Sequence, residues 1–86
     1  MAVMQVEVVS PEKRLFSGEA TEVYARSQEG EIAILPGHQP ALLALVEGHP
    51  VRVRTQDGQE QSFTLTGGFL EFRNNHLTVL ADGLAE

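Results

Sequence analysis

The chain has 86 residues and no cysteine, and twelve acidic side chains oppose six basic ones, which gives a formal net charge of −6. This length allows a single domain with a small core, and the lack of cysteine excludes disulfides and zinc–thiolate sites. The negative charge disfavours binding to nucleic acids and to anionic membrane surfaces, and no apolar run approaches the ~20 residues that span a bilayer. We therefore expect one domain over residues 1–86, with no membrane insertion and no nucleic-acid partner.

The first half of the chain alternates apolar and polar side chains, which is the period of a half-buried β-strand. Strands or short apolar elements are predicted over residues 4–9, 15–16, 22–27 and 31–35, with a turn at residues 28–30. Ser17 and Gly18 are expected to close the second of these elements. The side chains predicted to face the core are Met4, Val6, Val8, Val23, Ala25, Ile32 and Ile34. Pro36 fixes its own φ and Gly37 can adopt positive φ, so the last of these strands should end at a rigid corner.

The second half of the chain begins with an ambiguous apolar segment, residues 41–46. Alanine and leucine favour helix, but the length of the segment and its flanking Pro40 and Gly48 fit a buried strand better. Further strands are expected over residues 51–54, 63–65, 69–72 and 77–81. A hairpin turn is predicted at 56–59, and the paired glycines at 67–68 indicate a bulge or the close approach of another backbone. Nine or ten short strands with no convincing helix favour an antiparallel β-sandwich or a flattened barrel.

No arrangement of side chains typical of catalysis or metal binding is present in the sequence. His38, His49 and His76 lie far apart, and none has a second ligand-type residue at a motif spacing. No serine lies in a Gly-x-Ser-x-Gly elbow, and the paired glycines precede no predicted helix, so neither a nucleophile elbow nor a phosphate loop is supported. The residues alone therefore predict a small all-β binding module with no catalytic residue, no metal and no cofactor.

Four motifs in the sequence carry a resemblance to a known family. They are Leu15-Phe16-Ser17-Gly18, Glu29-Gly30-Glu31-x-x-Ile34-x-Pro36-Gly37-His38-x-Pro40, Gly67-Gly68-Phe69-Leu70-Glu71 and Val79-Leu80-Ala81-Asp82. In order and spacing they resemble the epsilon subunit of F-type ATP synthases across essentially the whole chain. The resemblance implies an all-β fold, a ten-stranded antiparallel sandwich of two five-stranded sheets. It also implies an accessory subunit of the proton-transporting ATP synthase that is not an enzyme on its own.

The resemblance implies two protein partners as well. In this family one face of the sandwich binds the rotating gamma subunit, and one edge rests on the polar loops of the membrane-embedded c-ring. By position, Glu29, Gly30 and Glu31 are expected to contact the c-ring, where an arginine of the ring loops would pair with Glu31. Ser10 and His38 are expected to contact gamma. The implied function is to couple proton-driven rotation of the ring to ATP synthesis, at the cytoplasmic face of the bacterial plasma membrane.

Two features depart from the family pattern. Ala33 stands where the family usually has glycine, so the backbone at that position should tolerate a β-carbon. Most bacterial members continue past the Ala81-Asp82 pair into an inhibitory two-helix hairpin. Residues 82–86 are therefore expected to be a tail leading to a helical domain that this chain lacks, and inhibition by that route is not expected.

Two other functions stay open from the residues alone. A free-standing sandwich would bind a peptide or a carbohydrate through the corner at Pro36, and it would form no complex with gamma. A small enzyme would use His38 with a nearby carboxylate, although the sequence suggests no substrate. A stable complex with gamma would exclude the first of these, and loss of turnover on His38→Ala would support the second.

Overall fold

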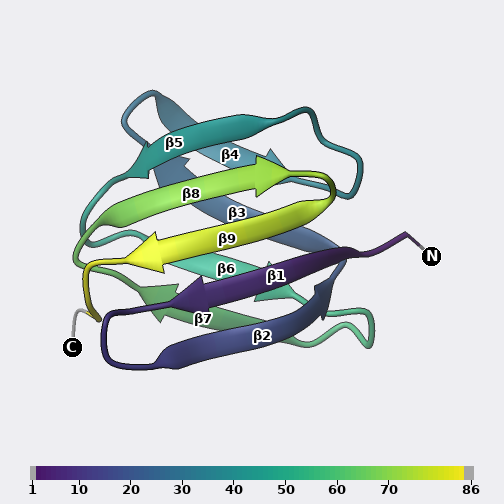
Figure 1. Ribbon diagram of the computed structural model, residues 1–86, viewed down its shortest axis with the longest axis horizontal. Helices are drawn as coiled ribbons and strands as arrows, with labels where there is room; N and C mark the ends of the chain where they lie inside the picture. The colour runs from purple at the N-terminus through teal and green to yellow at the C-terminus, as the bar shows by residue number, and fades with distance from the viewer. Residues whose placement is uncertain (1, 85–86) are drawn as a thin grey trace.

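Nine β-strands form one continuous and strongly curled sheet (Figure 1). The structure is a computed structural model and describes residues 2–84. The strands are β1 (Met4–Val9), β2 (Arg14–Ala20), β3 (Glu22–Ser27), β4 (Gly30–Ile34), β5 (Ala41–Leu45), β6 (Pro50–Arg54), β7 (Glu60–Thr64), β8 (Gly68–Arg73) and β9 (His76–Ala81). Hydrogen bonds connect them in the order β2-β1-β9-β8-β5-β3-β6-β7, and β4 pairs with β3. The all-β fold predicted from the sequence is confirmed.

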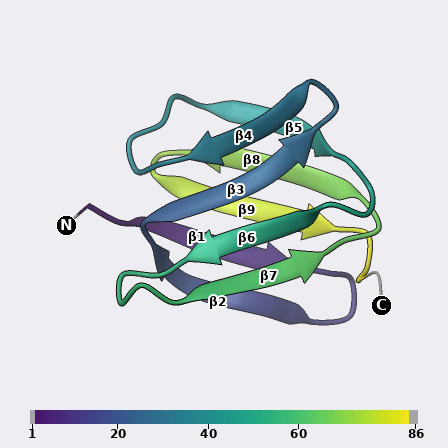
Figure 2. The ribbon, with the colours of Figure 1, turned by 180° about the vertical axis from the view of Figure 1, so that it is seen from behind.

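The curled sheet folds over into two layers, which the views from the front and from behind show in turn (Figures 1 and 2). The first layer holds β2, β1, β9, β8 and β5, and the second layer holds β4, β3, β6 and β7. β3 joins the layers, because it pairs with β6 over residues 22–24 and with β5 at Ser27. The architecture is therefore a β-sandwich whose two layers share one hydrogen-bonded sheet.

The core lies between the two layers and is built by strand alternation. Val23 lies opposite Val53 in the second layer, Leu70 lies opposite Val79 in the first, and all four side chains are fully buried. Burying a side chain of this kind stabilises the fold by about 1.5–3 kcal/mol. The side chains predicted to face the core are confirmed as buried for Met4, Val6, Val8, Val23, Ala25 and Ile34. Ile32 is half-buried and packs against the same cluster.

Three details of the predicted architecture are wrong. The described residues form nine strands rather than ten, and Leu65 joins Leu84 through a single isolated bridge. β1 and β9 pair in parallel, which is possible because a long stretch of chain rather than a hairpin connects them. β2 does not close at Ser17 and Gly18 but continues through them, because both residues pair with β1. Residues 85–86 of the predicted tail lie outside the described residues.

Segment β5 is a strand, as predicted, but it is not a buried one. Its side chains alternate between half-buried, exposed and buried, and Leu42 is 71% exposed. The difference arises because β5 belongs to the first layer, and none of the described residues covers the outer face of that layer. One side of the strand therefore faces the core and the other side faces solvent.

The paired glycines mark a close approach of two strands, as the sequence indicated. Gly68 has φ 140°, and a β-carbon built there would overlap the carbonyl oxygen of Leu80 and lie 3.0 Å from Cα of Ala81. Only glycine combines this backbone angle with this contact. The spacing between β8 and β9 at this point thus depends on the missing side chain.

Candidate functional site

The chain turns sharply after β4 at the corner predicted from Pro36. The amide of His38 donates a hydrogen bond to the carbonyl of Leu35 at 3.0 Å, which closes a four-residue turn. Gly37, the third residue of the turn, has φ 84°. Proline at the second position and positive φ at the third are typical of a type II turn. The corner is therefore a hydrogen-bonded turn of the kind that the Pro36-Gly37 pair predicts.

Contacts to the β8–β9 turn hold this corner in place. The amide of Gly37 donates to Oδ1 of Asn75 at 3.0 Å, and Nδ2 of Asn75 donates to the carbonyl of Val3 at 2.9 Å. The His38 ring meets the Phe72 ring edge-on, with 5.9 Å between the ring centroids. His38 is consequently fixed by packing against a core aromatic residue and stays half-buried.

The three residues expected to contact the c-ring lie at the turn between β3 and β4, where Glu29 is in the turn and Gly30 and Glu31 are the first two residues of β4. We call residues 29–31 the 29–31 turn. The hydroxyl of Ser27, which is only 7% exposed, donates to the carbonyl of Gly30 at 3.1 Å and accepts from the amide of Glu29 at 3.1 Å. The Ser27 hydroxyl thus bonds to the backbone at two points of the turn. Glu29 and Glu31 are both exposed to solvent on this fixed support.

Ser10 lies at the end of β1 and closes the loop to β2. Its amide donates to the carbonyl of Lys13 at 2.9 Å, and its hydroxyl accepts from the amide of the same residue at 3.3 Å. Ser10 therefore has a clear local role in shaping the loop, and it remains half-buried.

The expected contact residues fall at two opposite ends of the sandwich. The loop that begins at Ser10 and the turn at residues 29–31 both lie on the left in Figure 1, and the loop that holds His38 lies on the right. The strand registers agree, since Ser27 pairs with Leu45 near the end of β5, whereas His38 precedes the start of that strand. The two residues expected to contact gamma are thus separated by the length of a strand.

An apolar surface lies on the outer face of the first layer, between these two ends. Val9, Leu80, Phe69 and Ala44 form one cross-strand row, because the registers pair each with the next across β1, β9, β8 and β5. Leu42 lies two residues along β5 from Ala44 on the same side of the strand. Phe69 is 53% exposed and Leu80 is 52% exposed. We call these five residues the apolar face.

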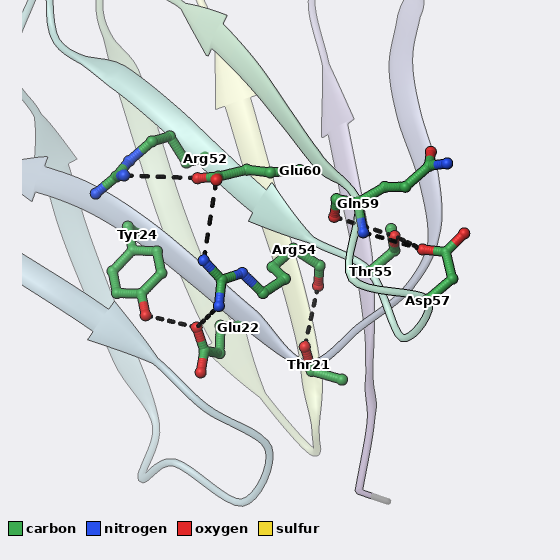
Figure 3. Close-up of polar contacts among 9 residues, drawn as sticks. All are labelled: Thr21, Glu22, Tyr24, Arg52, Arg54, Thr55, Asp57, Gln59 and Glu60. Atoms are coloured by element: carbon green, nitrogen blue, oxygen red, sulfur yellow. Dashed lines mark hydrogen bonds and ion pairs between the residues drawn. The ribbon is translucent and has the colours of Figure 1, made fainter.

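The outer face of the second layer is charged, and its charges are paired with one another (Figure 3). The hydroxyl of Tyr24 donates to Glu22, whose carboxylate lies 3.7 Å from Nη1 of Arg54. Glu60 lies 4.0 Å from Nη2 of Arg54 and 3.5 Å from Nη1 of Arg52. The Arg52 guanidinium then lies 4.9 Å from the centre of the Tyr24 ring, which closes the circuit. We call these five residues the charged face.

Two titratable groups on this second layer have shifted pKa values. The hydrogen bond to the Glu22 carboxylate raises the pKa of the Tyr24 hydroxyl, with desolvation as the next cause. Hydrogen bonds from the Thr55 hydroxyl and from the amide of Gln59 lower the pKa of Asp57 in the β6–β7 turn. The raised pKa favours the neutral Tyr24 hydroxyl, which can donate its hydrogen bond, and the lowered pKa favours the Asp57 carboxylate, which can accept its two.

A groove of about 560 Å³ lies beside the 29–31 turn on the second layer. Its lining includes Tyr24, Arg26, Glu31, Ala33, His49 and Arg52. Ala33 is an ordinary strand residue, paired with Tyr24, and its φ is not positive. Within residues 2–84, no three side chains of the metal-ligating types are grouped as a metal site. The groove is therefore a mixed polar and aromatic surface adjoining the expected ring contact.

Nearly the whole chain matches a known protein family. The family model for the beta-sandwich domain of the ATP synthase delta/epsilon chain matches residues 3–86. The chain belongs to this family. The ATP synthase epsilon chain of Streptomyces avermitilis is 44% identical over 81 residues, and that of Rhodococcus opacus is 48% identical over 82 residues. The chain spans 64% and 67% of the length of these two curated epsilon chains.

Solved structures share the fold of this epsilon-family domain. A chain of the Euglena gracilis mitochondrial ATP synthase, in a structure of OSCP, F1 and c-ring, superposes with a TM-score of 0.90 at 17% identity, covering 99% of this chain and 54% of that one. A chain from the central stalk and c-ring of the Tetrahymena thermophila enzyme gives 0.79 at 20% identity, covering 96% of this chain and 66% of that one. No helix within residues 2–84 is long and apolar enough to cross a membrane.

The loops that hold the expected contact residues were predicted from the sequence, but the apolar face and the charged face were not. The apolar face had a readable signal, because Val9, Phe69 and Leu80 occupy strand positions whose neighbours point into the core. The charged face had one too, since Arg52 and Arg54 alternate with two valines within the predicted strand over residues 51–54. What the sequence did not reveal was the pairing across strands, which places Arg26 opposite Glu31.

Proposed function

We propose that this domain is a non-catalytic component of the central stalk of a bacterial ATP synthase. It binds the gamma subunit through the apolar face and the c-ring through Glu29, Gly30 and Glu31, and so couples rotation of the ring to ATP synthesis. It is held at the cytoplasmic face of the plasma membrane by these contacts. The family relationship and the bacterial relatives support this function over a free-standing peptide- or carbohydrate-binding module.

The apolar face is the observation that carries the proposal. Three large side chains, Leu42, Phe69 and Leu80, each expose half or more of their surface on one side of one sheet. A contiguous apolar surface of this kind is typical of a protein interface, and aromatic residues at its centre supply most of the binding energy. A subunit lying along this face would reach Ser10 at one end and His38 at the other.

The 29–31 turn suits a second and weaker contact. Its backbone is fixed by Ser27, and its two carboxylates lie in solvent. An exposed ion pair contributes only about 0.2–1 kcal/mol. The affinity of the domain for the stalk therefore comes mainly from the apolar face, and the turn adds the attachment to the ring.

The test is to replace Phe69 and Leu80 by serine together and to measure binding to purified gamma. We expect the affinity to fall at least about tenfold, because both side chains lie at the centre of the proposed interface. The free energy of unfolding should fall by about 1.5–3 kcal/mol in total, because each side chain buries about half of its surface, so binding is measured below the melting temperature of the variant.

The matched control is Arg52→Ser, which truncates an exposed side chain on the opposite outer face. It should leave gamma binding unchanged. If the double variant is folded and still binds gamma like the unaltered domain, the apolar face is not the gamma contact and the proposal is wrong.

A further inference from the structure

The carboxylate expected to bind the ring already has a partner within the domain. Arg26 on β3 is the cross-strand neighbour of Glu31 on β4, and Nη1 of Arg26 lies 3.6 Å from Oε2 of Glu31. The Glu31 side chain is 80% exposed and the Arg26 side chain 42% exposed. Any cationic group that approaches Glu31 from solvent therefore meets a carboxylate that a neighbouring guanidinium partly neutralises.

The ion pair is not what holds the turn in shape. The two hydrogen bonds of the Ser27 hydroxyl fix the turn backbone whether or not Arg26 is charged. The Arg26–Glu31 distance of 3.6 Å is longer than a hydrogen bond, and only one nitrogen–oxygen contact is made. Such an exposed single contact does little to orient either side chain. Removing Arg26 should thus free Glu31 without altering where Glu31 is placed.

The adjoining groove gives the Arg26 side chain space to move away. The groove volume is about 560 Å³, and Arg26 and Glu31 both line it. On the far side of the groove, Arg52 lies over the Tyr24 ring and contacts Glu60, so this acidic side chain already has a cationic partner. A displaced Arg26 would therefore return to water in the groove rather than find a second acidic partner on that side.

We infer that Arg26 competes with a cationic side chain of the ring for Glu31 and so lowers the affinity of the ring contact. The inference rests on the proposed function, because it assumes that Glu31 meets the ring. Arg26 itself need not touch the ring, and its effect acts through Glu31. With Arg26 displaced, the turn presents the two charges of Glu29 and Glu31, and the partner must supply the compensating cation.

The experiment compares Arg26→Gln, Glu31→Gln and the double variant in the full chain. The apparent Kd of each is measured for a detergent-solubilised complex of gamma and c-ring, and all variants are melted to confirm the fold. We expect Arg26→Gln to tighten binding about two- to fivefold at low salt, the range that an exposed ion pair allows. The gain should disappear in the Glu31→Gln background and near 1 M salt, where the screening length falls to about 3 Å.

Arg54→Gln is the matched control for the loss of one positive charge. Arg54 lies on the same outer face, is 45% exposed, and contacts Glu22 at a similar distance of 3.7 Å. Arg54 pairs with Glu22 at the start of β3, whereas Arg26 lies near the end of that strand. Arg54→Gln should therefore leave the Kd unchanged. A general charge effect, in which Arg54→Gln tightens binding as much as Arg26→Gln, would overturn the inference.

The remaining outcomes separate the inference from the proposed function. If Glu31→Gln weakens binding but Arg26→Gln fails to tighten it, the ring contact stands and the competition is refuted. The competition is also refuted if Arg26→Gln tightens binding equally with and without Glu31. If Glu31→Gln has no effect on binding, then the proposed ring contact at Glu31 fails, and the inference fails with it.

Discussion

On the outer face of the first layer, Leu42, Phe69 and Leu80 lie in solvent, whereas on the outer face of the second layer Arg52 and Arg54 lie against acidic partners. Both faces come from the same alternation of side chains along strands. They differ in whether their groups can satisfy one another within one layer. Charged side chains can do so by pairing, but apolar side chains leave water only when another surface covers them. The first face is therefore the one that we propose a partner covers, whereas the charges of the second face pair within the domain.

The largest expected effect comes from disturbing the strands that carry the apolar face. Gly68→Ala forces a β-carbon into the carbonyl of Leu80 at a backbone angle that alanine rarely adopts. We expect the free energy of unfolding to fall by about 3 kcal/mol or more, and the melting temperature by more than about 10 °C. Calorimetry or circular dichroism would measure the change.

Gly83→Ala supplies the control for this substitution. A β-carbon at Gly83 would lie 3.4 Å from the Thr66 hydroxyl, and its φ is not in the left-handed region. It should cost less than about 1 kcal/mol. Equal melting temperatures for the two variants would show that the close approach of β8 and β9 does not limit stability.

An intermediate effect is expected from breaking the charged face. Arg54→Met keeps the aliphatic stem but leaves Glu22 and Glu60 without the cation between them. We expect a loss of about 0.5–1 kcal/mol at low salt, since the pairs are partly exposed, and a smaller loss at high salt. Binding to gamma should not change. Urea unfolding at two salt concentrations, with a gamma binding assay, would measure both.

The control for the charged face is Arg73→Met. Arg73 contacts Glu71 at 4.0 Å and its side chain is 71% exposed, so its removal should have almost no effect on stability. If Arg54→Met proves as neutral as Arg73→Met, the circuit of charges is not a stabilising feature, and the contrast between the two faces weakens.

The smallest effect concerns the pH dependence of the β6–β7 turn. Because the folded state lowers the pKa of Asp57, folding favours its carboxylate form. The resulting stability is present above the ordinary aspartate pKa near 4 and is lost as the pH falls through the folded pKa. Asp57→Asn removes this contribution. The difference in melting temperature between the two proteins should thus shrink from about pH 5 to about pH 2, and parallel curves would contradict the assignment.

Strand positions, turns and the core were predictable because each depends on residues close together in the sequence. Alternation located Val6 and Val23 in the core, and the Pro36-Gly37 pair located the corner. Pairing between distant strands was not predictable in the same way. The parallel contact of β1 with β9 depends on how the whole sheet closes, and no local pattern records it.

The candidate site shows the same division. The motifs in the sequence pointed to Ser10, to the 29–31 turn and to His38. They did not indicate that His38 lies at one end of the sandwich and Ser10 at the other. The apolar face was missed because its row is assembled from four strands. Each strand contributes one residue to this row, such as Val9 or Leu80, and a single outward-facing apolar residue does not by itself indicate an interface.

The pairing of β1 with β9 has a consequence for how the domain is made. β1 finds its second neighbour only when β9 has been synthesised, and contacts of such long range slow folding. Val9 and Leu80 lie side by side in the apolar row, although about 70 residues separate them in the sequence. The row proposed to bind gamma is therefore assembled only after β9 has been synthesised, although Val9 is available from the start.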